Sequence, residues 1–166
     1  HSSYYRNPSA LPPGAVLVVG SADSGCQIAK ELHASGRRVY LCVGRAGRRP
    51  RRYRGKDFMF WVVTMGRVEQ TADHLPSPSA RFAANPQLSG QDGGHTLNLH
   101  QFARDGVVLL DRFLGVDGHR IALAPDLQEN LANADQASED FKQGVDEFVR
   151  RTGMDVPEPE PDPVDE

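Results

Sequence analysis

A glycine turn between two regular elements is the part of this sequence whose residue types and spacing could do chemistry. Gly20 and Gly25 enclose Ser21-Ala22-Asp23-Ser24, directly after a run of branched apolar residues and directly before apolar residues at helical spacing. A buried strand that ends in such a turn and opens a helix brings backbone N–H groups and the positive end of the helix dipole to one point, where a pyrophosphate binds. The turn therefore predicts a dinucleotide site.

The residues of this turn have different expected tasks. Gly20 makes the tight turn, and Gly25 lets the helix lie close to the strand. Ala22 stands at the middle position, where the backbone must approach the phosphates, so its methyl group either displaces the dinucleotide slightly or is accommodated by a shift. A plain strand-to-helix turn without a ligand is the alternative interpretation.

The end of the second expected strand indicates which dinucleotide is preferred. A site that holds the ribose 2′-hydroxyl of NAD or FAD carries Asp or Glu about 20 residues beyond the glycines. This sequence has Gly44-Arg45 there, followed by Arg48 and Arg49. A guanidinium pairs with a 2′-phosphate through two hydrogen bonds and stacks on adenine. The residues therefore favour NADP(H), with Arg45 on the 2′-phosphate and Arg48 or Arg49 assisting; a solvated basic loop is the alternative.

The elements that must position this turn form a βαβ unit. Residues 15–19 indicate a strand that is buried on both faces. The apolar positions of 28–33 indicate a helix that stops at Gly36, and residues 38–43 indicate a second strand. Strand, glycine turn, helix and strand in this order predict an α/β fold: a Rossmann-like dinucleotide-binding domain with a parallel sheet flanked by helices.

The remaining patterns predict further elements and the domain organisation. After the βαβ unit we expect an aromatic-rich helix or strand at 57–65 and a loop at 71–94 that is typical of a functional excursion or lid. A short helix at 97–104 follows, and then two strands at 107–116 and 120–124 that form a small β-hairpin with a turn at Asp117-Gly118. The last predicted element is a long amphipathic helix at 126–151. The predicted parts are an N-terminal segment (1–14), one NADP-binding domain (15–153) and an extended, solvated, acidic and proline-rich linker (154–166).

Charge and composition limit the function classes. The formal net charge is −3, yet nine of the 19 Lys and Arg residues lie in 37–56, which favours a local anion site over general nucleic-acid binding. No apolar run approaches the ~20 residues that span a bilayer, and the first residues lack the layout of a signal peptide. With two cysteines and no export signal, we expect a cytoplasmic protein without a membrane association.

Two stretches resemble the second Rossmann motif of class B flavin monooxygenases. Residues 16–29 and 37–45 are most similar to bacterial flavin-containing monooxygenases and YUCCA-like oxidoreductases, and 48–55 is similar to the arginine-proline stretch that follows in that group. The resemblance covers residues 1 to about 60 well and the rest loosely. The chain departs from the family at Ala22, lacks the first glycine turn that binds FAD, and is less than half as long as family members, so it looks like a fragment.

The resemblance implies a reaction and its participants. NADPH would reduce an FAD held by a domain of the same polypeptide that is absent from this chain, and the reduced flavin would use oxygen to oxygenate a small-molecule substrate. Ser21, Asp23 and Ser24 would contact the phosphates and the nicotinamide side. The fragment alone is expected to bind nucleotide without turnover, and no catalytic residue is assigned. A non-catalytic NAD(P)-sensing regulatory module is the alternative.

Other chemistries find less support in the sequence. The six histidines lack metal-ligand spacings, although His95 and His100 could meet in space. Cys26 begins the expected helix, where a thiolate would be stabilised, but a small buried side chain is the favoured interpretation. The motifs of serine hydrolases and P-loop proteins are absent. Aromatic residues near the basic loop permit single-stranded nucleic acid in principle, yet an apolar core segment explains them better.

Overall fold

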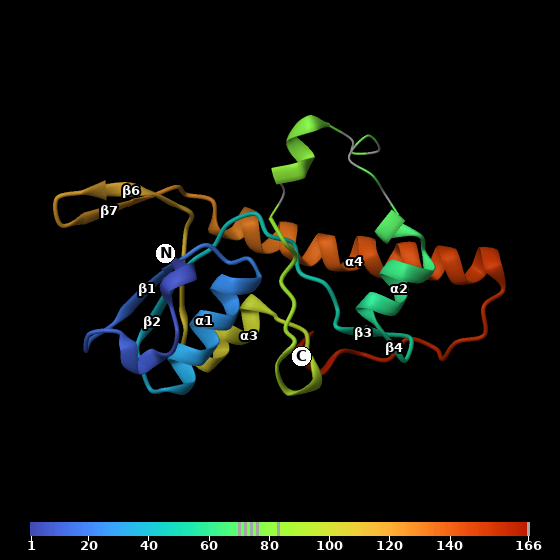
Figure 1. The fold of residues 1–166 in the computed structure, drawn as a ribbon, viewed down its shortest axis with the longest axis horizontal. Helices are drawn as coiled ribbons and strands as arrows, with labels where there is room; N and C mark the ends of the chain where they lie inside the picture. The colour runs from blue at the N-terminus through green and yellow to red at the C-terminus, as the bar shows by residue number, and fades with distance from the viewer. Residues whose placement is uncertain (70, 72, 74, 76, 83, 166) are drawn as a thin grey trace.

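A parallel three-stranded sheet organises the first part of the computed structural model, which describes residues 1–69, 71, 73, 75, 77–82 and 84–165 (Figure 1). The strands lie in the order β1-β2-β5, and α1 connects the first two. Their bounds are β1 Val16–Val19, α1 Asp23–Ala34, β2 Val39–Cys42 and β5 Val108–Leu110. This architecture confirms the expected α/β, Rossmann-like fold.

The helix and the central strand bury their apolar residues against each other. Ala29 and Leu32 of α1 and Val39 and Leu41 of β2 are all 0% exposed. Burying a side chain of leucine or valine size stabilises the fold by about 1.5–3 kcal/mol relative to leaving it exposed. The helix ends where Gly36 adopts a φ of 81°, as its position in the sequence predicts.

The chain between β2 and β5 forms the second part of the fold. The basic loop contains a small hairpin, and the aromatic segment is a helix whose Trp61 is fully buried. These elements are β3 (Arg52–Tyr53), β4 (Lys56–Asp57), α2 (Phe58–Thr64) and, before β5, α3 (Leu99–Asp105). Residues 72, 74, 76 and 83 of the loop expected at 71–94, and with them His74 and Pro76, lie outside the described residues.

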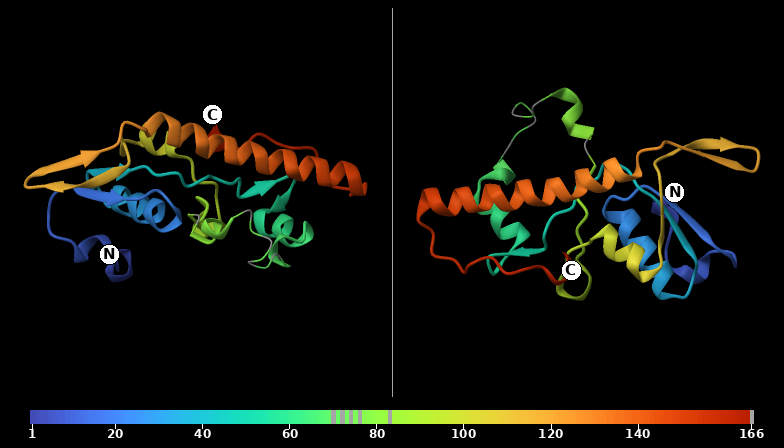
Figure 2. Two further views of the ribbon diagram at one scale, coloured as in Figure 1. Left: turned by 90° about the horizontal axis from the view of Figure 1, so that it is seen from above. Right: turned by 180° about the vertical axis from the view of Figure 1, so that it is seen from behind.

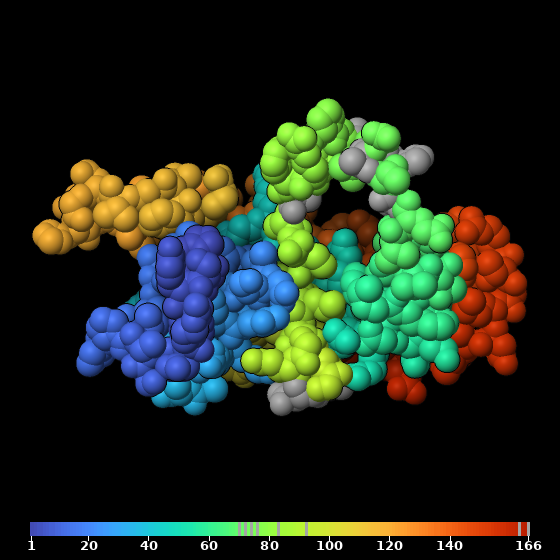
Figure 3. All heavy atoms as spheres, viewed as in Figure 1, coloured from blue at the N-terminus to red at the C-terminus, as the bar shows by residue number. Residues whose placement is uncertain are grey.

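The expected strand at 107–116 is two strands, which corrects the sequence-based prediction. The chain leaves the sheet after β5 and forms an antiparallel hairpin of β6 (Phe113–Asp117) and β7 (Arg120–Leu123), which projects from the body (Figures 1 and 3). Asp111 explains the break, because its Oδ1 accepts hydrogen bonds from the backbone N–H groups of Asp126 (2.9 Å) and Leu127 (2.7 Å). The carboxylate thus fixes the start of the last helix and ends β5.

The last helix, α4 (Leu127–Thr152), begins beside the sheet and runs to the end of the molecule opposite the β6–β7 hairpin (Figures 1 and 2). Its first half contributes Leu131 to the cluster around the sheet, and its second half contributes Phe141 and Val145 to a second cluster with Tyr53 and Trp61. Across the described part of the chain, no helix, this one included, has the length and apolar character to cross a membrane.

The tail was expected to be an extended, solvated linker, but its end is bound to the body of the protein. The backbone carbonyl of Val164 accepts a hydrogen bond from Asn98 Nδ2 (2.9 Å), and Asp165 forms an ion pair with Arg48 (2.6 Å). A proline-rich segment has few backbone N–H groups to form structure of its own, so its conformation follows from its side-chain partners. Here a buried guanidinium draws the acidic end onto the body.

Candidate nucleotide-binding turn

The glycine turn has the close approach that its spacing predicts. Gly20 adopts a φ of 97°, a backbone conformation that residues other than glycine rarely adopt. At Gly25, a Cβ atom would lie 1.9 Å from the carbonyl oxygen of Gly20, so no larger residue fits without a shift of the backbone. Both glycines are therefore required by the geometry, and the first turn of α1 lies directly on the end of β1.

The start of α1 faces an open groove. Ala22 is the N-cap and has no side chain that can accept a hydrogen bond from the first helical N–H groups. Ala22, Ser24 and Gly25 line a groove of about 680 Å³ between β1, α1 and the N-terminal segment. Ser24 is exposed there, whereas Asp23 accepts a hydrogen bond from Gln27 Nε2 (2.5 Å). The helix thus presents free N–H groups and the positive end of its dipole to the groove.

Ser21 has a structural task in addition to its place in the turn. It is 1% exposed, and its Oγ accepts a hydrogen bond from the backbone N–H of Gly44 at 3.1 Å. This bond connects the glycine turn to the end of β2, where Arg45 follows directly. The sequence suggested a phosphate contact for Ser21, but the hydroxyl is used inside the protein.

Arg45 lies at the end of β2, as expected, but outside the residues that line the groove. Its guanidinium is largely exposed and forms an ion pair with Glu129 of α4 at 2.6 Å. Its carbonyl oxygen accepts a hydrogen bond from Asn133 Nδ2 at 3.2 Å. An exposed pair of this kind contributes about 0–1 kcal/mol, so Arg45 can exchange Glu129 for another anion at little cost.

Arg48 and Arg49, the expected helpers, are engaged elsewhere. Arg48 is 7% exposed and pairs with Asp135 (2.9 Å) and Asp165 (2.6 Å). Arg49 donates through Nη1 to the carbonyl oxygens of Arg48 and Ala137, both at 2.8 Å. Both guanidiniums attach the loop after β2 to α4, and that of Arg48 also binds the tail, so neither is assigned to the nucleotide.

The residues that sequence reasoning missed are on α4. Asn130 is fully buried and donates through Nδ2 to the carbonyl oxygen of Val43 at 3.2 Å, which holds the end of β2 in place. Glu129 and Asn133 contact Arg45 from the same turns of the helix. One signal was available, because Asn130 interrupts an otherwise apolar stripe that includes Leu127, Leu131 and Ala134.

Cys26 and the histidines take no part in this site. Cys26 is 0% exposed, and burial, followed by the nearby Asp23, raises the pKa of its thiol to about 12, so it is a small neutral core side chain. His95 contacts Lys30 and His100 contacts Asp135, and the two do not pair with each other. Among the residues described, no three His, Cys, Asp or Glu side chains gather as metal ligands.

Comparison with known proteins relates part of this chain to an oxidoreductase. It is 46% identical over 83 residues to an uncharacterized CzcO-like oxidoreductase of Geobacillus kaustophilus. The aligned stretch is 49% of this chain and 23% of that relative, so the chain matches about a quarter of the relative's length. No family model matches the sequence. No solved structure gives a significant match.

Proposed function

We propose that this chain is the NADP(H)-binding part of a flavin-dependent oxidoreductase of the monooxygenase type. The observation that carries the proposal is the Gly20–Gly25 turn, where a Cβ at Gly25 would lie 1.9 Å from the Gly20 carbonyl oxygen. A βα turn that needs glycine at both places opens a helix with an uncapped N-terminus toward a groove. A pyrophosphate is the group that such a turn accommodates in Rossmann-like domains.

The proposed nucleotide lies across the carboxyl ends of β1 and β2. The backbone N–H groups of Ala22, Asp23 and Ser24 would bind the pyrophosphate. Arg45 would leave Glu129 and pair with the 2′-phosphate, because a doubly charged phosphate is a stronger partner for guanidinium than an exposed carboxylate. The hydrogen bond from Gly44 N–H to Ser21 Oγ would keep these two contacts at a fixed separation.

The flavin and the oxygenated substrate belong to the remainder of the proposed protein. This chain has one Gly-x-x-x-x-Gly turn between a strand and a helix, and its match covers 23% of the length of the related protein, whose name supports assignment to the oxidoreductases. Bound NADPH would supply a hydride to the flavin. The residues of this chain would hold the nucleotide and keep its adenosine end fixed.

The proposal is tested by fluorescence titration of NADPH and NADH into the chain and into Arg45→Ala. Arg45→Ala should weaken NADPH binding by at least about tenfold, the value of one charge-assisted hydrogen bond, and leave NADH binding within twofold. Arg120→Ala, an exposed arginine of the hairpin, is the matched control and should bind both nucleotides as the wild type does. Equal losses for NADPH and NADH would remove Arg45 from the 2′-phosphate.

A further inference from the structure

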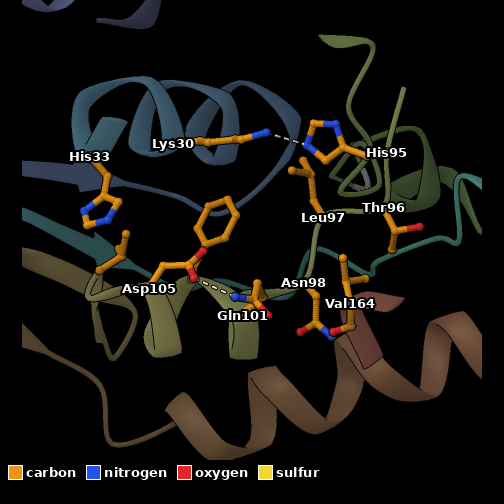
Figure 4. A pocket seen from close by; sticks show the side chains of 11 residues that line it. Lys30, His33, His95, Thr96, Leu97, Asn98, Gln101, Asp105 and Val164 are labelled. Atoms are coloured by element: carbon orange, nitrogen blue, oxygen red, sulfur yellow. Dashed lines mark hydrogen bonds between the residues drawn. The ribbon is translucent and has the colours of Figure 1, made fainter. Parts of the chain in front are cut away.

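A second hollow lies between α1 and α3, away from the glycine turn (Figure 4). Its volume is about 210 Å³, and Leu97, Phe102 and Val107 form apolar walls, with Val164 of the tail at one side. Lys30 and His33 reach it from the second half of α1. Because a helix rises 1.5 Å per residue, Lys30 lies roughly 10 Å along α1 from Asp23. The hollow is therefore separate from the proposed nucleotide site.

Lys30 brings a positive charge to the rim of this hollow. Its Nζ lies 2.8 Å from His95 Nε2, and His95 Nδ1 lies 3.3 Å from the carbonyl oxygen of Gln91. These contacts fit a neutral imidazole that donates from Nδ1 to Gln91 and accepts from Lys30 at Nε2. An ammonium has three N–H donors, so two of them stay available to a ligand.

The charge of Lys30 has no carboxylate partner among the described residues. Arg45, Arg48 and Lys142 are each paired with an acidic side chain. Asp105, the acidic residue that lines the same hollow, lies 2.5 Å from Gln101 Nε2 and forms no ion pair with Lys30. Figure 4 shows Lys30 directed at His95 and the amide of Gln101 directed at Asp105. The hollow thus combines apolar walls with a lysine that forms no ion pair with any acidic side chain that the structure describes.

We propose that this hollow binds a small monocarboxylic acid with a compact or flat apolar body. The carboxylate would accept hydrogen bonds from Lys30, and the body would lie against Leu97, Phe102 and Val107. The volume sets the size, because an apolar cavity of about 150 Å³ holds benzene and drug-sized ligands occupy about 300–1,000 Å³. At about 210 Å³, the hollow has room for one ring and one carboxylate.

Benzoate is the probe, and amide chemical shifts of the ¹⁵N-labelled chain, without nucleotide, report where it binds. Saturable shifts are expected at Leu97 and Gln101. Lys30→Met should weaken binding at least about tenfold, because a hydrogen bond to a charged group is lost, and Lys30→Arg should keep it within a fewfold change. Lys56→Met is the matched control and should bind benzoate like the wild type. It makes the same substitution at a lysine whose Nζ lies 5.4 Å from the ring centre of Phe60.

Benzyl alcohol separates recognition of the charge from recognition of the ring. It should bind at least about tenfold more weakly than benzoate. The proposal is overturned if no shift saturates up to the solubility limit of benzoate, if Lys30→Met binds like the wild type, or if benzyl alcohol binds equally well. Arg45→Ala should bind benzoate normally, so failure of this site and failure of the nucleotide site give different results.

Discussion

The two apolar clusters of this chain are assembled in different ways. The cluster around the sheet has its centre in neighbouring elements, because Val18 of β1, Ala29 of α1 and Leu41 of β2 lie within one βαβ unit. Phe102 of α3 and Leu131 of α4 join it from farther along the chain. The second cluster joins Tyr53, Trp61, Phe141 and Val145, which come from three separate segments of the chain. Local apolar spacing therefore determines the centre of the first cluster, whereas the second cluster requires long-range contacts between α4 and residues 53–61.

Arginine–carboxylate pairs make those long-range contacts. Arg48 connects the loop after β2 to α4 and the tail, and Arg54 connects the β3–β4 hairpin to Asp146 of α4 at 2.6 Å. Both arginine side chains are largely buried, at 9% and 14% exposed. Four of the nine basic side chains of the stretch 37–56 thus connect it to α4: Arg45, Arg48, Arg49 and Arg54.

Removal of Trp61 should break the second cluster most strongly. Trp61 is 0% exposed, so Trp61→Ala leaves a large cavity. The substitution should lower the free energy of unfolding by about 3–5 kcal/mol. Hydrogen exchange should accelerate in α2 and the second half of α4 while β1, β2 and β5 keep most of their protection. Phe60→Ala, at the half-exposed neighbouring ring, is the control and should cost much less. Equal acceleration in both regions would contradict the division into two clusters.

Removal of the Arg48 charge should have the next largest effect. Arg48→Met leaves Asp135 and Asp165 without their cation, and we expect a loss of about 2 kcal/mol by chemical denaturation. This is below the 3–5 kcal/mol of a fully buried pair because both carboxylates reach water. Arg45→Met removes an exposed pair and should change the stability by less than about 1 kcal/mol. If both variants lose the same amount, burial of the pair does not matter.

The ionisation of Tyr53 should lower the free energy of unfolding at alkaline pH. Burial, together with the hydrogen bond to Asp146 (2.9 Å), raises the pKa of Tyr53 to about 12. A raised pKa contributes stability that is complete below the ordinary value of about 10 and is lost as the pH rises toward 12. Tyr53→Phe should therefore cost about 1 kcal/mol at pH 7, and the difference from the wild type should shrink between pH 10 and 12. A constant difference would exclude Tyr53 as the titrating group.

The smallest effect is expected at Glu129. Glu129→Gln removes the competitor of the 2′-phosphate for Arg45, and the free energy of unfolding should change by less than about 1 kcal/mol. NADPH should bind a fewfold more tightly, while NADH binding stays constant. Glu139→Gln, on the same helix and paired with Lys142, is the control and should leave both affinities unchanged. Tighter binding of both nucleotides would indicate a general charge effect.

The sequence predicted those parts of the fold that local patterns determine. The apolar run before Gly20, the helical spacing to Gly36 and the amphipathic stretch after Asp126 each specify one element and its buried face. The close approach at Gly25 follows from the same pattern, because the turn must bring α1 onto β1.

The parts that were predicted incorrectly depend on residues far apart in the chain. Asp111 ends β5 because its carboxylate caps the start of α4. It accepts the hydrogen bond of the Leu127 N–H, which is sixteen positions later in the chain. Arg48 is buried because Asp135 and Asp165 lie beside it, and no local spacing indicates either partner. The sequence marks Asn130 as a polar residue within the apolar stripe of α4, but its partner, the carbonyl oxygen of Val43 at the end of β2, could be seen only in the structure.

Amide chemical-shift mapping with NADP⁺ on the ¹⁵N-labelled chain tests the assignment of the glycine turn most directly. Saturable shifts are predicted at Gly20, Ser24 and Gly25, with a further shift at Arg45 that NAD⁺ does not produce. Shifts that never saturate, or that avoid residues 20–25, would contradict it.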